Sequence, residues 1–305
     1  RADVLVENFR PGAMARLGYA WEDLADRYPS LVYASISGFG QTGPMSGQAA
    51  YDAVVQALGG IMSVTGPAGG EPTRVGTSIA DLGGGLFGAV GILAALVERA
   101  ATGRGRRVDV AMLDGQVALL ENALARLGAT GVAPGPGGGH HPSIAPFGTF
   151  AAADGQIVLA AGNDELFRRC CAALGAPALA ADDRFLTNVE RCLHRDELVA
   201  ALEAILAGSG VERWLADLEA AGVPCAAVRD VGQLATDPQV AARRMLVKLE
   251  GPPGHPLSGL TVAGNPVKLS GVHDPATRPL PPALDQHRDA ILAELEAAEE
   301  GATGA

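Results

Sequence analysis

An aspartate set just before three consecutive glycines is the feature of this sequence best suited to covalent chemistry. Asp81 lies two residues before the run Gly83-Gly84-Gly85, and an apolar stretch over 86–101 then predicts a buried helix. The dipole of that helix would hold a carboxylate at its start ionised, and glycine N–H groups can stabilise an oxyanion beside it. This is the environment of a nucleophile. The alternative is that Asp81 only caps the helix, since aspartate is among the best N-cap residues.

The three glycines favour a ligand at this position. Each glycine in a helical turn costs on the order of 1 kcal/mol relative to alanine, so something must need the space that the missing side chain leaves. Close approach of a ligand to the backbone is the usual reason. A ligand beside Asp81 agrees with the interpretation of this residue as a nucleophile.

Two other loops follow predicted strands, where α/β proteins bind ligands. Residues 38–43 match a GxGxxG pattern, but Pro44 comes next and no helix opens there, so a dinucleotide site is excluded. This loop either presents backbone amides to a phosphate or acyl group or is a plain connection. The segment Asn8-Phe9-Arg10-Pro11-Gly12, with Arg16, is either part of a ligand-binding edge or a turn with solvated arginines.

Metal and disulfide chemistry are not expected. His140 and His141 are adjacent, but no carboxylate or cysteine pattern accompanies them, and this makes a poor metal site. The four cysteines form no CxxC pair and have no zinc spacing, so reduced thiols are expected at Cys170, Cys171, Cys192 and Cys225.

Strand-like and helical runs alternate over the first third of the chain, which predicts βαβ units and a mostly parallel sheet. A Gly/Pro-rich stretch at 128–146 predicts a hinge, and the turn Asp154-Gly155 predicts a β-hairpin. The predicted strands are 4–7, 31–37, 107–112, 147–152, 157–161 and 245–249. The predicted helices are 21–27, 50–58, 86–101 with a glycine C-cap, 113–127, 165–174, 191–206, 211–220 and 288–299.

The composition excludes several classes of protein. The 305 residues are 48% hydrophobic and 19% charged, unlike a disordered or fibrous chain. A net charge of −11 makes nucleic acids and anionic membranes unexpected partners. The chain opens without a secretion signal, and its longest apolar stretch, 86–97, is shorter than the ~20 residues of a membrane span, so a soluble cytoplasmic protein is expected. Because it starts at Arg1, we expect a fragment of a longer protein.

Motifs along the whole chain share their order with a known family. They are 2–12, 33–40, Asp81 with its glycines, Thr102-Gly-Arg-Gly105 with 108–114, 141–146, 162–164, 221–224 and 237–240. In this order they resemble the family III coenzyme A transferases, which include formyl-CoA transferase and carnitine CoA-transferase and have α-methylacyl-CoA racemase as a relative. The resemblance implies an enzyme with no metal and no permanently bound cofactor, whose substrates are a coenzyme A thioester and a small carboxylic acid.

The resemblance also implies which residues act. In the family a catalytic aspartate precedes the buried helix that ends in TGRG, which makes Asp81 a nucleophile that carries an anhydride and then an aspartyl-CoA thioester. Asp52 matches a glutamate near that aspartate, and Gly137, Gly138 and Gly139 resemble a mobile loop that shields the intermediate from water. The positions that resemble the CoA-contacting stretch are Asn8, Phe9, Arg16 and Leu17.

The implied fold is α/β, with a Rossmann-like large domain, a smaller α+β domain and a C-terminal segment that returns to the large domain. We place the large CoA-binding domain at 1–128, the hinge at 129–142, the small domain at 143–245 and the C-terminal segment at 246–305. Family members are interlocked homodimers, so a homodimer is expected. The family begins with βα elements that precede the start of this chain, so part of the CoA site is expected to lie outside it.

The leading interpretation is transfer of CoA from an acyl-CoA donor to a carboxylic acid, and the segment 141–146 favours succinyl-CoA and other dicarboxylates. An acyl-CoA racemase is one alternative, but Tyr51 stands where racemases have a histidine, and a phenol is a poor base at neutral pH. The other alternative is a catalytically inactive CoA-binding or interaction subunit. Asp285-Gln-His-Arg288 also departs from the family's Gly-Glu-His-Thr, which leaves the role of that turn open.

Overall fold

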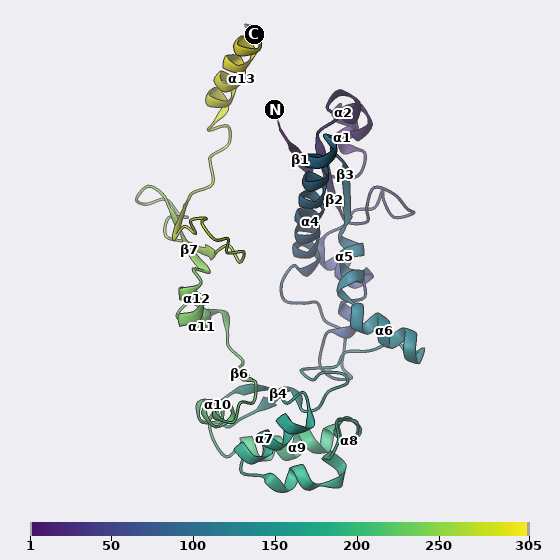
Figure 1. Ribbon diagram of the computed structural model, residues 1–305, viewed down its shortest axis with the longest axis vertical. Helices are drawn as coiled ribbons and strands as arrows, with labels where there is room; N and C mark the ends of the chain where they lie inside the picture. Colours follow the sequence, from purple (N-terminus) through teal and green to yellow (C-terminus); the bar gives the residue numbers. More distant parts are fainter. Residues whose placement is uncertain (1, 304–305) are drawn as a thin grey trace. The chain divides into compact units, whose positions relative to one another are not determined.

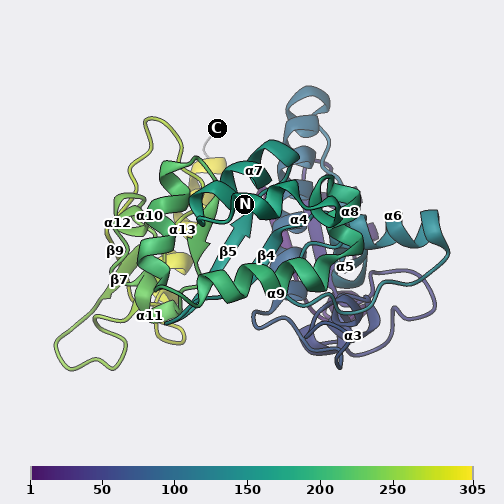
Figure 2. The same cartoon turned by 90° about the horizontal axis from the view of Figure 1, so that it is seen from below.

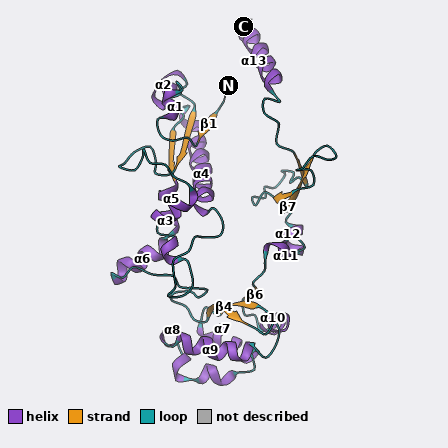
Figure 3. Cartoon of the chain, turned by 180° about the vertical axis from the view of Figure 1, so that it is seen from behind, coloured by secondary structure: helices purple, strands orange, loops and turns teal. Residues whose placement is uncertain are grey.

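The computed structural model describes residues 2–303, with side chains through residue 297. Contacts between residues divide the chain into two compact units, 1–227 and 228–305, and each is described by itself. The ribbon in Figure 1 follows the chain through both units. Strands are short and helices predominate, so the molecule is of mixed α/β type (Figure 3).

The sheet region, residues 2–130, is built on a parallel three-stranded sheet in the order β1-β2-β3. The register pairs Val4 with Val32 and Tyr33 with Arg107, which confirms the predicted parallel pairing. A Rossmann-like arrangement stays a prediction. The elements of this region are β1 Val4–Glu7, α1 Ala13–Arg16, α2 Trp21–Arg27, β2 Val32–Ser37, α3 Asp52–Leu58, the 3-10 helix η1 Met62–Val64, α4 Ile79–Thr102, β3 Arg107–Ala111, α5 Met112–Leu119 and α6 Glu121–Thr130.

The long helix α4 lies along the sheet at close range (Figure 1). Glycines make this approach possible, since a Cβ added at Gly88 would lie 2.7 Å from Ile36 Cδ1 and one at Gly91 would lie 2.6 Å from Val108 Cγ1. The helix ends at Gly103, whose φ of 71° is the left-handed conformation expected of a glycine C-cap.

The outward side of α4 does not match the prediction of a helix buried all round. Leu86 is 70% exposed, Val90 64% and Val97 74%, so the sheet region covers only one side of the helix. Among the described residues α4 is also the one helix with the length and apolar composition of a membrane span. In the structure α4 packs against β2, β3, α3 and α5, so its apolar composition is explained by its place in the sheet region.

Several helix boundaries differ from the predicted ones. α4 begins at Ile79 rather than at 86, because glycines that resemble loop residues are part of the helix. The predicted helix 113–127 is two helices separated at Leu120, whose ψ of 20° is not helical. The predicted helix 191–206 is likewise two helices separated at His194, with ψ of 32°.

The lobe, residues 143–227, contains an antiparallel sheet in the order β4-β5-β6 covered by helices (Figure 2). The pairing of Phe147 with Ala160 through Ala151 with Gln156 confirms the predicted hairpin. The elements are β4 Phe147–Ala151, β5 Gln156–Ala160, α7 Asp164–Ala173, the 3-10 helices η2 Pro177–Ala181 and η3 Asp183–Phe185, α8 Asn188–Leu193, α9 Arg195–Leu206, α10 Val211–Ala220 and β6 Cys225–Ala227.

The lobe has a well-closed apolar core. Leu198, Leu202 and Leu206 recur every four residues along α9, are at most 1% exposed, and belong to the same buried cluster as Phe150 of β4. Trp214 closes one end, and its indole Nε1–H donates to the Leu206 carbonyl oxygen at 2.8 Å.

The second unit, 228–305, contains a small sheet in the order β8-β7-β9. Its first helix is stabilised by a capping box, in which Asp230 and Gln233 each accept from the other's backbone N–H at 2.8 Å. The predicted boundaries at 128, 142 and 245 and the return of the C-terminal segment to the large domain stay predictions. The elements are α11 Val231–Leu234, α12 Pro238–Ala242, β7 Leu246–Glu250, β8 Thr261–Ala263, β9 Thr277–Pro279 and α13 Arg288–Thr303.

Candidate active site

The N-terminal turn of α4 lies at the carboxyl edge of the sheet. α4 crosses back from the end of β2 to the start of β3, so it runs opposite to the strands. Gly84 accordingly packs on Ile36 near the end of β2, whereas Gly91 packs on Val108 near the start of β3. Asp81 is therefore at the edge where open α/β sheets bind their ligands.

Asp81 is inside the first turn of α4 and does not cap it. The helix begins at Ile79 and its N-cap is Ser78, so the capping alternative is wrong. Gly83, Gly84 and Gly85 lie beyond the first four residues of the helix, whose N–H groups alone lack a partner within it. The expectation that the N–H groups of these glycines stabilise an oxyanion is therefore also wrong.

Gly85 leaves open space beside Asp81. Residues four apart on a helix share a face, and Gly85 follows Asp81 at that spacing. A Cβ added at Gly85 would meet no heavy atom within 4 Å, and Asp81 itself is exposed. A ligand can therefore reach the carboxylate along this face. The sheet-facing Gly84 instead serves packing, because its Cβ would lie 3.2 Å from Met112 Cγ.

Asp52 anchors the backbone next to Asp81. Its side chain is buried, with Oδ1 accepting from the Ala80 backbone N–H at 2.8 Å and Oδ2 accepting from Gln56 Nε2 at 2.7 Å. Gln56 Oε1 accepts in turn from the Val75 N–H at 2.8 Å. One buried network thus joins α3 to the first turn of α4 and to the loop that leads into it.

Gln56 was not among the residues predicted from the sequence. Its side chain is fully buried, and every hydrogen bond it makes outside α3 is to the segment before α4. Its spacing of four residues after Asp52 on a predicted helix is a signal that the two side chains meet. The loop that they hold together becomes visible only in the folded chain.

The electrostatic environment of Asp81 favours its neutral form more than water does. Burial raises the pKa of Asp81 above its ordinary value of 3.8, and the nearby carboxylate of Asp52 raises it further. This is opposite to the direction expected from the helix dipole alone. A carboxylate whose charge is poorly stabilised is a more reactive nucleophile once ionised.

The residues matched to CoA contacts follow β1 at the same edge of the sheet. The Phe9 backbone N–H donates to Glu7 Oε2 at 2.8 Å, which fixes the turn after the strand. Phe9 is 55% exposed and Leu17 is 64% exposed, and Arg16 lies in the last turn of α1. The roles of Asn8, Phe9, Arg16 and Leu17 in CoA binding stay predictions.

The glycine loop, Gly137–Gly139, connects two parts of unit 1. The Gly138 N–H donates to the Gly66 carbonyl oxygen at 3.1 Å, and the Thr149 N–H of β4 donates to the Gly139 carbonyl oxygen at 3.0 Å. The loop is thus held between the segment after η1 and the first strand of the lobe. Its function as a lid stays a prediction.

The two buried thiols of α7 are poor competitors of Asp81 as nucleophiles. Burial raises the pKa of Cys170 to about 12 and that of Cys171 to about 11, which disfavours the thiolate form. Within the described residues, no three side chains of His, Cys, Asp or Glu gather as a metal site. Asp81 is the candidate nucleophile.

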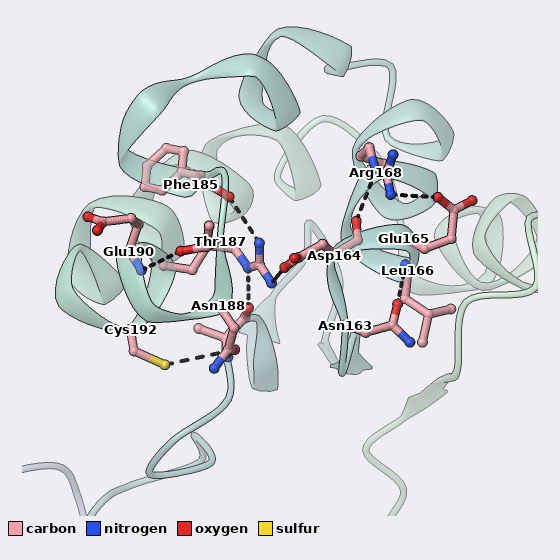
Figure 4. Close-up of polar contacts among 12 residues, drawn as sticks. Asn163, Asp164, Glu165, Leu166, Arg168, Phe185, Thr187, Asn188, Glu190 and Cys192 are labelled. Atoms are coloured by element: carbon pink, nitrogen blue, oxygen red, sulfur yellow. Dashed lines mark hydrogen bonds and ion pairs between the residues drawn. The ribbon is translucent and has the colours of Figure 1, made fainter.

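Side chains of α8 hold the segment before β4 through hydrogen bonds that were not predicted from the sequence. Arg191 is fully buried, and its guanidinium donates to the carbonyl oxygens of Ala145 at 2.6 Å and Phe185 at 3.0 Å and to Asp164 Oδ1 at 2.7 Å. Asn188 Nδ2 adds a hydrogen bond to the Ser143 carbonyl oxygen at 2.9 Å. In Figure 4, dashed lines run to Phe185 and to Asp164 from the guanidinium that lies between them.

Comparison with known proteins defines the family. The model of CoA-transferase family III matches residues 1–288. A crystal structure of a CAIB/BAIF family protein from Brucella suis superposes with a TM-score of 0.82 and 36% identity, over 96% of this chain and 75% of that one. The chain belongs to CoA-transferase family III.

Two curated relatives give the level of similarity. The chain is 48% identical to the acetyl-CoA:oxalate CoA-transferase of Acetobacter aceti over 98% of its own length and 75% of the relative's. It is 37% identical to the succinate–glutarate CoA-transferase of Agrobacterium fabrum over 99% of its length and 74% of the relative's. The protein is therefore an enzyme, a CoA-transferase.

Proposed function

We propose that this enzyme moves CoA from an acyl-CoA donor to a carboxylic acid through a covalent intermediate on Asp81. The observation that carries the proposal is an exposed carboxylate at the carboxyl edge of the sheet, with open space beside Gly85. Asp52 holds the backbone of the preceding residue, Ala80, and so fixes the position of the nucleophile.

The proposed reaction balances without a redox or metal cofactor. A carboxylate oxygen of Asp81 attacks the donor thioester carbon, the C–S bond breaks, and an anhydride and a CoA thiolate form. The thiolate attacks the Asp81 carbonyl carbon, releasing the donor acid and leaving an aspartyl-CoA thioester. The acceptor carboxylate attacks this thioester to give a second anhydride. The released thiolate then takes the acceptor acyl group and regenerates Asp81.

We infer that the acceptor acid is dicarboxylic. The two relatives described above are named for acetyl-CoA and oxalate and for succinate and glutarate. Another relative, from Haloarcula hispanica, is named a succinyl-CoA:mesaconate CoA-transferase and is 38% identical. Succinyl-CoA and acetyl-CoA are accordingly the first donors to test, with oxalate and glutarate as acceptors.

Trapping with hydroxylamine tests the intermediate. Hydroxylamine converts an aspartyl-CoA thioester to an aspartyl hydroxamate and free CoA, so mass spectrometry of peptides should locate the label on Asp81. Asp81→Ala should lose both label and transfer, whereas Asp26→Asn, on the exposed side of α2, should keep both. Undiminished transfer by Asp81→Ala would overturn the assignment.

We further propose that the glycine loop excludes water from the intermediate. Gly137 offers a clean test, because a Cβ there would come no closer than 3.8 Å to the His140 carbonyl oxygen. Gly137→Ala should restrict the loop without a clash and raise the ratio of acyl-CoA hydrolysis to transfer. Gly128→Ala, where a Cβ meets nothing within 4 Å, is the matched control. An unchanged ratio in Gly137→Ala would remove the loop from the mechanism.

Racemisation is the competing activity, and we propose that the enzyme lacks it. Tyr51, which is 82% exposed, precedes Asp52 and offers a phenol where a racemase needs a base. Deuterium exchange at the α-carbon of 2-methylacyl-CoA measures this directly. Deuterium incorporation at a rate comparable to CoA transfer would make racemisation the leading function.

We also infer that the active form is a homodimer. The exposed apolar side chains of α4, Leu86, Val90 and Val97 among them, supply a surface that a second chain can cover. Light scattering at micromolar concentration should give twice the chain mass, and a monomer that retains full transfer would contradict the inference.

A further inference from the structure

The first turn of α4, which carries Asp81, is capped by a residue of another helix. A helix is usually capped by the residue before it, whose side chain accepts from the N–H of the second or third helical residue. Ser78 holds that position, but its side chain makes no such hydrogen bond among the described residues. The N–H of Ala80, the second residue of α4, instead donates to Asp52 Oδ1 at 2.8 Å. The cap of α4 therefore comes from α3.

Gln56 is the side chain that completes this cap. It lies one turn after Asp52 on α3 and is fully buried, and its Nε2 donates to Asp52 Oδ2 at 2.7 Å. Each carboxylate oxygen of Asp52 thus accepts a hydrogen bond, one from the backbone of α4 and one from Gln56. These hydrogen bonds replace the water that a buried carboxylate loses, and the N-terminus of a helix favours an acidic group beside it.

The same amide holds the loop before α4. Gln56 Oε1 accepts from the Val75 N–H at 2.8 Å, and Nε2 donates a second hydrogen bond, to the Thr77 carbonyl oxygen at 3.3 Å. Within the described part of the chain, Gln56 is the one residue beyond this loop and α4 that hydrogen-bonds to residues 74–78. Loss of the amide would therefore release the loop that leads into the turn of Asp81.

The arrangement of partners requires an amide at position 56. The oxygen of the side chain faces an N–H group and its nitrogen faces two oxygens, so glutamine fits in one orientation. An ionised glutamate would bring a second carboxylate against Asp52. A methionine has a similar unbranched shape but would leave the partners without their hydrogen bonds.

This network reaches Asp81 in two ways. Ala80 precedes Asp81 in the chain, so its hydrogen bond to Asp52 fixes the backbone from which the nucleophile projects. Burial raises the pKa of Asp81 and the carboxylate of Asp52 raises it further, which shows that the two carboxylates are near each other. A change at Gln56 is therefore transmitted to the candidate nucleophile through one residue, Asp52.

We propose that Gln56 is a positioning residue for the reaction: its amide holds Asp52 as the cap of α4 and thereby places the Asp81 carboxylate for attack. Gln56 acts through Asp52 and the loop rather than on the substrate. The inference rests on the proposed function, because it takes Asp81 as the nucleophile. A misplacement of about 1 Å can lower a rate on the order of a hundredfold, so the effect should appear in kcat.

Steady-state kinetics of the full-length enzyme test the proposal, with succinyl-CoA or acetyl-CoA as donor and oxalate as acceptor. Gln56→Met should lower kcat at least about tenfold and change KM less than about threefold, because the misplaced group is the nucleophile and not a binding group. Gln116→Met is the matched control. Gln116 is also fully buried, on α5, but its amide has no hydrogen-bond partner among the described residues, so kcat should stay close to the wild-type value.

Gln56→Glu separates the hydrogen bond from packing. A protonated glutamate can donate to Asp52 Oδ2 as the amide does, whereas an ionised one repels it. Burial and the charge of Asp52 raise the pKa of the introduced carboxyl, so it should gain a proton as the pH falls from about 8.5 to about 6. The kcat of Gln56→Glu relative to wild type should therefore rise over this range, while that of Gln56→Met stays low and constant.

The outcomes separate a positioning role from a structural one. A merely structural Gln56 would lower the melting temperature and leave kcat of the folded enzyme and its pH profile unchanged. That result, or equal kcat for Gln56→Glu and Gln56→Met at every pH, overturns the proposal. If Gln56→Met does not fold, the rise of Gln56→Glu with falling pH carries the test alone, and a constant ratio to wild type overturns the proposal. Failure of the proposed function looks different, because a wild type that transfers CoA without a hydroxylamine label on Asp81 refutes the covalent mechanism in every variant.

Discussion

The lobe and the sheet region bury their apolar side chains to different degrees. In the lobe, Phe150, Leu202 and Leu218 are at most 1% exposed, and sixteen buried residues form one cluster. In the sheet region the corresponding cluster consists of Leu24, Leu31 and Tyr33, and the outward side of α4 is open. The lobe therefore completes its own core within one chain. The sheet region leaves apolar surface to be covered, on the same helix that carries Asp81.

The difference arises from how α4 uses its sequence. Its sheet-facing side carries Gly84, Gly88 and Gly91, so the helix gains close contact with the sheet but buries little side-chain area there. Its large apolar residues, such as Leu86 and Val97, face outward. Fully burying a leucine or valine contributes about 1.5–3 kcal/mol, so a partner surface over this side would contribute substantially to stability.

The largest effect should come from the lobe, at Arg191. Arg191→Ala removes three hydrogen bonds, leaves the carbonyl oxygens of Ala145 and Phe185 without this donor, and opens a cavity beside Phe167. The free energy of unfolding should fall by about 3–5 kcal/mol. Urea unfolding followed by the fluorescence of Trp214 measures the lobe, provided that Trp21 is replaced by phenylalanine.

The exposed Arg168→Ala is the control for this prediction. Arg168 pairs with Glu165 on the surface of α7, and such pairs contribute about 0–1 kcal/mol. Similar losses for Arg168→Ala and Arg191→Ala would mean that the lobe is not held by its buried arginine, and the contrast between a closed and an open region would weaken.

An activity effect should follow at the open face of α4. Gly85→Leu places a side chain in the space beside Asp81, where nothing in the chain lies within 4 Å of an added Cβ. The value of kcat/KM for transfer should fall about ten- to hundredfold while the fold is retained, because the substrate path is blocked. Steady-state kinetics and the melting temperature check the two parts. Unimpaired transfer would show that the substrate reaches Asp81 from another side.

Two alanine substitutions in α4 should have opposite signs. At Gly91 a methyl group would lie 2.6 Å from Val108 Cγ1, a stiff β-branched neighbour, so Gly91→Ala should destabilise by about 1–2 kcal/mol. Gly85→Ala meets open space and should stabilise by about 0.5–1 kcal/mol through helix propensity. Trp21 fluorescence, with Trp214 replaced by phenylalanine, follows unfolding of the sheet region. The same sign at both positions would contradict the division of α4 into packed and open sides.

The sequence predicted best those elements whose signals are local. β1, α2 and α10 have the predicted bounds, because short runs of one propensity are closed by turn residues. The start of α4 was wrong because Gly83–Gly85 resemble a loop until Ile36 and Met112 of the sheet are brought against them. The burial of Gln56 could not be predicted, since a polar residue on a helix is ordinarily solvated, although its spacing from Asp52 indicates that the two side chains meet. Only the fold shows that Gln56 is buried under the loop before α4.

The smallest predicted effect is that of the Asp81 charge on the free energy of unfolding. Its sign tests whether the start of α4 stabilises or destabilises this charge. Burial and the carboxylate of Asp52 raise the pKa of Asp81 in the folded state above its ordinary value of 3.8, so the folded protein binds this proton more tightly than the unfolded chain. The stability linked to this proton is fully present below pH 3.8 and is lost as the pH rises through the raised value. Asp81→Asn should therefore increase the free energy of unfolding at neutral pH, by less than about 1 kcal/mol because solvent screens an exposed group. The gain should disappear at acid pH.

Asp23→Asn, in the first turn of α2, loses a favourable interaction with the helix dipole and should change stability with the opposite sign. Urea unfolding at pH 7.5 and below pH 3.8 compares the variants. A loss of stability in Asp81→Asn at neutral pH would show that the start of α4 stabilises the charge of Asp81, as the helix dipole alone predicts, and that the reactivity inferred for this carboxylate needs another source.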